Sequence, residues 1–138
     1  MFLKIRLDAT SGVQMHEISV AQTIVNEILA EAERQSAAKV TRVVLELGKL
    51  TMLNFDQVSF WVSAFLEGTA GEDAEISITP VDGSVECREC KAISDVVVED
   101  DPTLHYSVPQ FTCERCGSHN TFICKGREMV IKTIRIER

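Results

Sequence analysis

Two Cys-x-x-Cys pairs constrain this chain more than any other feature of its sequence. The first pair is Cys87 and Cys90, the second is Cys113 and Cys116, and residues 91–112 separate them. A two-residue spacer lets both sulfurs of a tight turn point into the same space, so two such turns supply four thiolates at the roughly 2.3 Å distance that zinc prefers. Because four ligands leave no open position, we predict a structural Zn²⁺, with binding worth about 10–16 kcal/mol to a module too small to fold alone.

Disulfides, redox chemistry and an iron centre are the alternative uses of these cysteines. Disulfides belong mainly to oxidising compartments, and the odd fifth cysteine, Cys124, fits them poorly. Thioredoxin-like redox chemistry is disfavoured because neither pair lies where a strand leads into a helix. An iron ion held by four thiolates stays open.

Length and charge narrow the class of protein further. A chain of 138 residues that is 45% hydrophobic can bury about two-thirds of its surface. Its 14 basic and 21 acidic residues give a net charge of −7, which argues against nucleic acid as a partner. No apolar run approaches the ~20 residues that span a bilayer, and charges interrupt the opening residues MFLKIRLDAT. We therefore expect a cytoplasmic protein without a signal peptide or membrane segment.

Hydrophobic periodicity predicts two helices and three strands. One helix is expected just after Ser19, and a second helix after Asn54, because each of these residues begins a capping-box pattern with a glutamine three residues later. The expected strands cover residues 40–47, 74–79 and 128–137. This order predicts an α/β (α+β) fold, in which a small sheet packs against two helices.

The cysteine-containing segment divides the expected fold. Residues 84–125 carry an acidic run and two prolines, which indicate an inserted, zinc-ribbon-like domain built on a long loop or hairpin. Residues 15–83 together with 126–138 then form the α/β domain. Residues 1–14 are expected to be a disordered or non-native leader, although the alternation of Leu3, Ile5 and Leu7 could add an edge strand.

Several stretches carry a resemblance to a known family. They are MHEISVAQTIV at 15–25, VVLELGKLTMLNFDQVSFWVSAFLEGT at 43–69, the pairs CREC and CERCG, and the closing GREMVIKTIRIE. Together they resemble the HypA family of hydrogenase maturation factors over nearly all of the chain after Gln14. The resemblance implies a nickel metallochaperone in which a nickel-binding α/β domain carries an inserted zinc domain. It assigns zinc to Cys87, Cys90, Cys113 and Cys116, although the proline that often follows the third ligand is Glu114 here.

The same resemblance assigns Ni²⁺ to Met15, His16 and Glu17. A neutral imidazole beside backbone nitrogens can form fused chelate rings around Ni(II), which prefers a square plane of donors. In the family this motif opens the protein, so that the terminal amine can be a donor. Here fourteen residues precede Met15 and make its nitrogen an ordinary amide, which loses a proton much less readily.

Three further side chains are candidates for the metal sites. His105 could add an imidazole to the nickel site, with an exposed loop histidine as the alternative. His119 is expected to hydrogen-bond a zinc-bound sulfur, and ligand exchange is a second option. Cys124 is expected to be a small buried residue, with a spare thiolate as the alternative.

The sequence contains no pattern of a catalytic site, so we predict that the protein is not an enzyme. It has no phosphate-binding glycine loop and no nucleophile elbow. The resemblance implies two partners: a HypB-type GTPase that supports delivery, and the large subunit of a nickel–iron hydrogenase that receives nickel. Whether urease is a further recipient and whether the protein forms a homo-oligomer stay open. A zinc-ribbon scaffold or adaptor without nickel transfer and an iron–thiolate electron carrier are the competing functions.

Overall fold

The computed structural model describes residues 2–6, 16–96 and 111–138, and the chain forms two compact units. The first unit consists of Met1–Leu47, Leu53–Thr79 and Met129–Arg138, and the second consists of Gly48–Met52 and Pro80–Glu128. The second unit is therefore assembled from segments that interrupt the first along the chain. Independent folding of the predicted insert, residues 84–125, stays a prediction.

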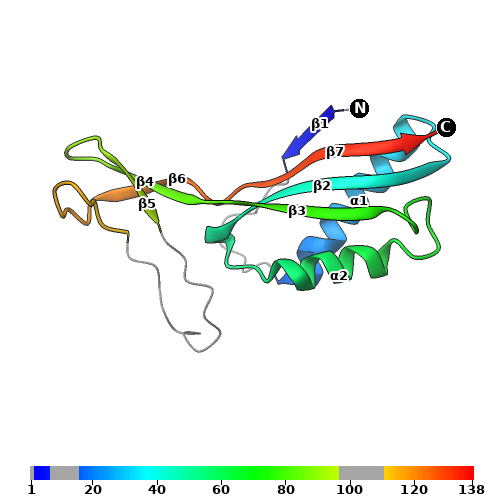
Figure 1. Ribbon diagram of the computed structural model, residues 1–138, viewed down its shortest axis with the longest axis horizontal. Coiled ribbons are helices and arrows are strands. Elements are labelled where there is room, and N and C mark those ends of the chain that lie inside the picture. Colours follow the sequence, from blue (N-terminus) through cyan, green and yellow to red (C-terminus); the bar gives the residue numbers. More distant parts are fainter. Residues whose placement is uncertain (1, 7–15, 97–110) are drawn as a thin grey trace. The chain divides into compact units, whose positions relative to one another are not determined.

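A four-stranded sheet forms the framework of the first unit (Figure 1). Its strands are β1 (Phe2–Arg6), β2 (Lys39–Gly48), β3 (Glu75–Val81) and β7 (Met129–Glu137), in the order β1-β7-β2-β3. Strand β7 pairs antiparallel with both β1 and β2. The closing residues of the sequence thus lie in the interior of the sheet, which explains why they are rich in β-branched and apolar side chains.

Two helices pack with this sheet around one hydrophobic core. They are α1 (Glu17–Arg34) and α2 (Phe55–Phe65), and the core joins their apolar faces to the inward side chains of β2 and β7. Its fully buried members include Ile24 and Ile28 of α1, Val58 of α2, Leu45 of β2 and Ile131 of β7. This arrangement confirms the predicted α+β fold of two helices on a small sheet.

The beginnings of the two helices test the capping predictions. Asn54 precedes α2, and its side chain accepts a hydrogen bond from the N–H of Gln57 at 3.1 Å, as the sequence predicts. The prediction for α1 is wrong, because that helix begins at Glu17 and His16 is its N-cap. Ser19 lies inside the first turn, where its carbonyl accepts a hydrogen bond from the hydroxyl of Thr23. The predicted start is too late because the apolar pattern shows only where the buried face begins. The first buried residue of α1 is Val20, although the helix itself begins at Glu17.

The leader is a second point of difference. Phe2–Arg6 form strand β1, in register with β7 through the Phe2↔Thr133, Ile5↔Ile131 and Arg6↔Val130 pairs. For these residues the expectation of disorder is wrong, and the alternative of an edge strand is confirmed. Without β1, the side of β7 opposite β2 would lack backbone partners, and Ile5 gains contact with the core. The remaining leader residues, 7–14, lie outside the described part of the chain.

The second unit contains a three-stranded antiparallel sheet. Its strands are β4 (Gly83–Cys87), β5 (Ile93–Val96) and β6 (Thr121–Lys125), in the order β5-β4-β6, and a short 3₁₀ helix, η1, covers Lys49–Thr51. The sequence predicts a long loop or hairpin between the two cysteine pairs, but it does not predict the strands β4 and β6 on either side of them. Within the described part of the chain, no helix is long and apolar enough to cross a membrane.

Candidate metal centre

The first Cys-x-x-Cys turn, which we call the first knuckle (Cys87–Cys90), connects β4 to β5. Cys87 is the last residue of β4, and its N–H donates to the carbonyl of Ala92 at 2.9 Å. The N–H of Lys91 donates a hydrogen bond to the carbonyl of Cys87 at 3.0 Å, and this bond closes the turn. Lys91 reaches this position with a left-handed backbone, at a φ of 66°.

The second knuckle (Cys113–Cys116) repeats this geometry just before β6. The N–H of Gly117 donates to the carbonyl of Cys113 at 2.8 Å, and Gly117 has a φ of 74°. In this turn a glycine occupies the left-handed position that Lys91 occupies in the first knuckle. In both turns the N–H of the second cysteine points at the sulfur of the first, with N···Sγ distances of 3.5 Å.

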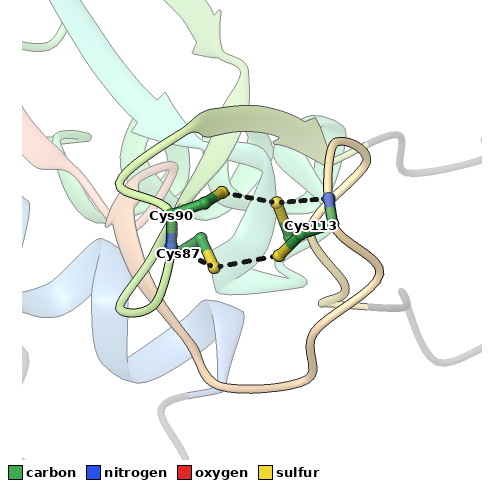
Figure 2. A group of neighbouring side chains, drawn as sticks. Cys87, Cys90 and Cys113 are labelled. Atoms are coloured by element: carbon green, nitrogen blue, oxygen red, sulfur yellow. Dashed lines mark hydrogen bonds between the residues drawn. The ribbon is translucent and has the colours of Figure 1, made fainter.

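The two knuckles bring all four sulfurs together. The Sγ atoms of Cys87 and Cys116 are 3.6 Å apart, those of Cys90 and Cys113 are 3.5 Å apart, and all four lie within 4.8 Å of one another. Figure 2 shows the labelled side chains of Cys87, Cys90 and Cys113 converging on one space. Four sulfurs at about 2.3 Å from a tetrahedral ion are about 3.8 Å apart, so this donor set fits zinc.

The same distances decide against the disulfide alternative. A disulfide requires an S–S distance of about 2.05 Å, whereas the two closest pairs are 3.5 Å and 3.6 Å apart. None of the five cysteines forms a disulfide. In each of these two close pairs, one sulfur belongs to the first knuckle and the other to the second, as expected if both knuckles bind the same ion.

The sulfurs differ in how strongly the protein favours their ionised form. The N–H of Cys116, which donates to the sulfur of Cys113, lowers the pKa of Cys113 to about 6. The N–H of Cys90 lowers the pKa of Cys87 in the same way. The N–H of Ser118 also lowers the pKa of Cys116, but the protons shared with Cys87 and the other sulfurs outweigh it and raise the value to about 12. The hydrogen bonds within the cluster therefore favour ionisation of Cys113, whereas the shared protons and burial disfavour ionisation of Cys116.

The residues predicted to bind nickel lie partly within the described chain. His16 is exposed at the N-cap of α1, and Glu17 is the first residue of that helix. A carboxylate oxygen of Glu17 accepts a hydrogen bond from the N–H of Asn54 at 3.0 Å, which ties the start of α1 to the start of α2 and lowers the pKa of Glu17. Met15 and His105 lie outside the described residues.

The sequence pattern indicates Glu17 only as a metal ligand and does not predict its contact with Asn54. The two residues lie far apart in sequence, and the Glu17 carboxylate accepts from the main-chain N–H of Asn54. No pattern of side chains can therefore predict this contact.

Two other predicted residues lie near the second knuckle. His119 is exposed on the turn that leads into β6, and its carbonyl accepts a hydrogen bond from the N–H of Thr121 at 2.9 Å. Its proposed contact with a zinc-bound sulfur stays a prediction. Cys124 lies on β6 and is exposed, so the expectation of a buried residue is wrong, because β6 is an edge strand whose side chains are largely solvent-accessible.

The fold and the sulfur cluster together define a small α+β metalloprotein with a four-thiolate centre in its second unit. A protein family described as "Hydrogenase/urease nickel incorporation, metallochaperone, hypA" matches residues 15–136. The chain therefore belongs to the HypA family, whose members are nickel-incorporation metallochaperones rather than catalysts.

Individual relatives and solved structures agree with this assignment. The chain is 38% identical over 124 residues to the hydrogenase maturation factor HypA of Methanothermobacter thermautotrophicus, covering 90% of this chain and 98% of the relative. It is 37% identical to the HypA protein of Chlorobium phaeobacteroides, covering 89% of this chain and all of the relative. The solution structure of the nickel metallochaperone HypA from Helicobacter pylori is similar with a TM-score of 0.62 and 25% identity, covering 89% of this chain and 98% of that one.

Proposed function

We propose that this protein binds Ni(II) at the segment around His16 and delivers it, with a HypB-type GTPase, to the large subunit of a nickel–iron hydrogenase during maturation. One observation carries the proposal: the match to the nickel-incorporation family begins at Met15, which places Met15-His16-Glu17 at the start of the matched residues. Reduced thiols and a thiolate centre suit a reducing compartment, which supports a cytoplasmic location.

The exposed start of α1 suits a transport site for nickel. An N-cap imidazole reaches solvent, and the first N–H groups of a helix have no acceptor within the helix, so backbone nitrogens there can be offered to a metal. Neutral imidazole and deprotonated amide nitrogens favour a square plane of donors, which Ni(II) accepts. Glu17 adds negative charge beside this segment, and Met15 is a further proposed donor. An imidazole from His105 stays an optional additional ligand, with an exposed loop histidine as the alternative.

The four cysteines hold zinc in this proposal and do not carry the transported metal. A centre with four sulfur ligands has no vacant position for an incoming donor, so it suits a permanent ion. Nickel, by contrast, must be bound and released in each delivery. Two chemically different sites in two units allow these two requirements to be met separately.

Replacement of His16 tests the assignment of nickel. His16→Ala should abolish tight nickel binding while zinc stays at one ion per chain, because the imidazole contributes only to the nickel site. His119→Ala, which removes an exposed histidine from the other unit, is the matched control and should keep its nickel affinity. Competition titration against a nickel chelator, run with zinc analysis, measures both quantities, and undiminished nickel affinity in His16→Ala would refute the assignment.

The leader allows a test of the terminal amine as a donor. Removal of residues 1–14 should strengthen nickel binding if a free amine at Met15 replaces an amide. This truncation also removes β1, so a second truncated chain, in which an added Gly-Ser precedes Met15, separates the two effects. Equal nickel affinity of the two truncated chains would exclude the terminal amine.

Delivery requires contact with the GTPase, because the sequence contains no nucleotide-binding pattern of its own. Isothermal titration of the nickel-loaded protein into a HypB-type GTPase should detect binding that depends on the first turn of α1. Exposed Ile18, with 49% of its surface accessible, is the residue to replace there. Absence of binding in every nickel and nucleotide state would remove this delivery route but would leave the nickel site intact.

A further inference from the structure

The two knuckles of the metal centre are attached to the protein in different ways. The first knuckle is part of the three-stranded sheet, because Cys87 ends the central strand β4 and β5 begins shortly after Cys90. Its second residue, Arg88, donates its N–H to the carbonyl of Asn120 at 2.9 Å. Main-chain hydrogen bonds therefore hold the first knuckle on both sides.

The second knuckle lies outside the strands, and its main-chain hydrogen bonds close its own turn. The N–H of Cys113 donates to the carbonyl of Ser118, and the N–H of Gly117 donates to the carbonyl of Cys113. Among the described residues, two hydroxyl groups connect residues 111–117 to the sheet. Ser94 of β5 accepts from the N–H of Glu114 at 3.1 Å, and Thr121 of β6 donates to the carbonyl of Phe111 at 2.6 Å.

Ser94 is the more informative of the two hydroxyls because of where it lies. In β5 the buried positions alternate, and Ser94 and Val96 are the two inward residues. An apolar side chain is the usual occupant of such a position, yet Ser94 keeps only 4% of its surface accessible. Its hydrogen bond satisfies the N–H of Glu114 next to the ligand Cys113, and an alanine there would leave that donor without its partner.

We propose that Ser94 is a positioning residue of the zinc centre, and that the metal is released by opening of the second knuckle before the first. The hydroxyl of Ser94 holds the backbone at Glu114, so that the sulfurs of Cys113 and Cys116 face those of the first knuckle. A chelator removes the ion by replacing its sulfur ligands one after another. We expect the second knuckle to be displaced first, since fewer of the main-chain hydrogen bonds found among the described residues hold it.

No electron is gained or lost in this step. With zinc bound, two donor atoms of a chelator would replace the sulfurs of Cys113 and Cys116, and the freed thiolates would stay ionised or take protons from the buffer. The two remaining Zn–S bonds, to Cys87 and Cys90, then break in the same way.

Zinc release from the full chain tests the role of Ser94. Transfer of zinc to an excess of a chromogenic chelator should be about five-fold faster in Ser94→Ala, the effect of losing one hydrogen bond of about 1 kcal/mol. Ser94→Thr retains the hydroxyl and should restore the rate to within about two-fold. Thr41→Val is the matched control, because it removes a hydroxyl that donates to the carbonyl of Arg135 in the other unit. An unchanged rate in Ser94→Ala, or equal acceleration by Thr41→Val, would overturn the assignment.

The order of release is tested in the unsubstituted protein. Cys87 and Cys113 form a matched pair, since 1% and 2% of their surfaces are accessible and each is the first cysteine of its knuckle. During slow zinc removal by a chelator in the presence of iodoacetamide, mass spectrometry of the peptides should find Cys113 alkylated before Cys87. Simultaneous alkylation, or alkylation of Cys87 first, would overturn the proposed order.

Discussion

Identical Cys-x-x-Cys turns contain cysteines with different chemistry. The main-chain hydrogen bond from Cys116 lowers the pKa of Cys113 to about 6, whereas a proton shared with neighbouring sulfurs and burial raise the pKa of Cys116 to about 12. Zinc binds the thiolate forms, so binding must displace the proton of Cys116 at any physiological pH. The spacing of the cysteines predicts that their sulfurs converge. It does not predict the difference in pKa, which depends on which N–H donates to which sulfur.

Zinc affinity should therefore increase with pH. Metal binding releases at least the proton of Cys116 at pH values well below 12, and each proton released raises the affinity about ten-fold per pH unit. Cys113 adds a further released proton below its pKa of about 6, so the dependence should steepen on acidification. Competition titrations from pH 5 to 8 measure this slope, and an affinity independent of pH would contradict the shared proton.

Lys91 and Gly117 allow a test of backbone strain in the knuckles. Both residues adopt a left-handed backbone, which costs a residue with a Cβ atom about 1–2 kcal/mol. Lys91→Gly should raise the thermal stability of the zinc-loaded protein by about 1 kcal/mol, since the Lys91 side chain is exposed. Gly117→Ala should have the opposite effect, and thermal unfolding of both variants measures the difference.

At the scale of secondary-structure elements, tertiary contacts modify local preferences. The helix α1 begins without a side-chain cap, and its first residue instead bonds the N–H of Asn54 at the start of α2. The strand β1 forms because β7 provides an edge for it. Where contacts with another element determine the end of a helix or strand, a local pattern cannot locate that end. This explains the wrong predictions of a helix start after Ser19 and of disorder at Phe2–Arg6.

The last turn of α1 contains a buried carboxylate that should make stability depend on pH. Glu31 accepts hydrogen bonds from the side chains of Gln35 at 3.1 Å and Arg34 at 2.8 Å, which lower its pKa from the ordinary value of 4.5. Because the pKa is lower in the folded state, the stabilisation is complete above about pH 4.5 and is lost as the pH falls further through the folded value.

Glu31→Gln tests this contribution. The variant should be about 1 kcal/mol less stable than the parent at pH 7, and the difference should shrink below pH 4.5 as Glu31 becomes protonated. Urea unfolding at pH 7 and pH 3.5 measures both values. A difference that stays constant over this range would assign the effect to packing and not to the ionised carboxylate.

At the scale of the whole molecule, each of the two units has hydrophobic residues of its own. The first unit buries both helices against β2 and β7. Of the described residues of the second unit only a few are buried, among them Val85, Val96, Cys87 and Cys113. A unit with so few apolar contacts depends on its metal more than the larger one does.

Loss of a zinc ligand should therefore affect the two units differently. Cys113→Ala is expected to release zinc and to unfold residues 84–125, while the α/β unit retains its circular dichroism and its resistance to protease. Cys124→Ala, which removes a thiol outside the sulfur cluster, is the control and should keep one zinc per chain. Simultaneous unfolding of the whole Cys113→Ala chain would show that the insert does not fold independently.

The sequence by itself determined the features that depend on residue spacing. Period-3.6 and period-2 patterns locate both helices and the strands β2, β3 and β7, and two Cys-x-x-Cys turns imply a four-sulfur centre, because these signals are local or repeat at a fixed interval. Tertiary structure alone decided the contacts made between distant segments, such as Glu17 with Asn54 and Ser94 with Glu114. In each of these hydrogen bonds the donor is a main-chain N–H, which every residue except proline carries. The type of the donor residue therefore does not indicate which side chain it contacts.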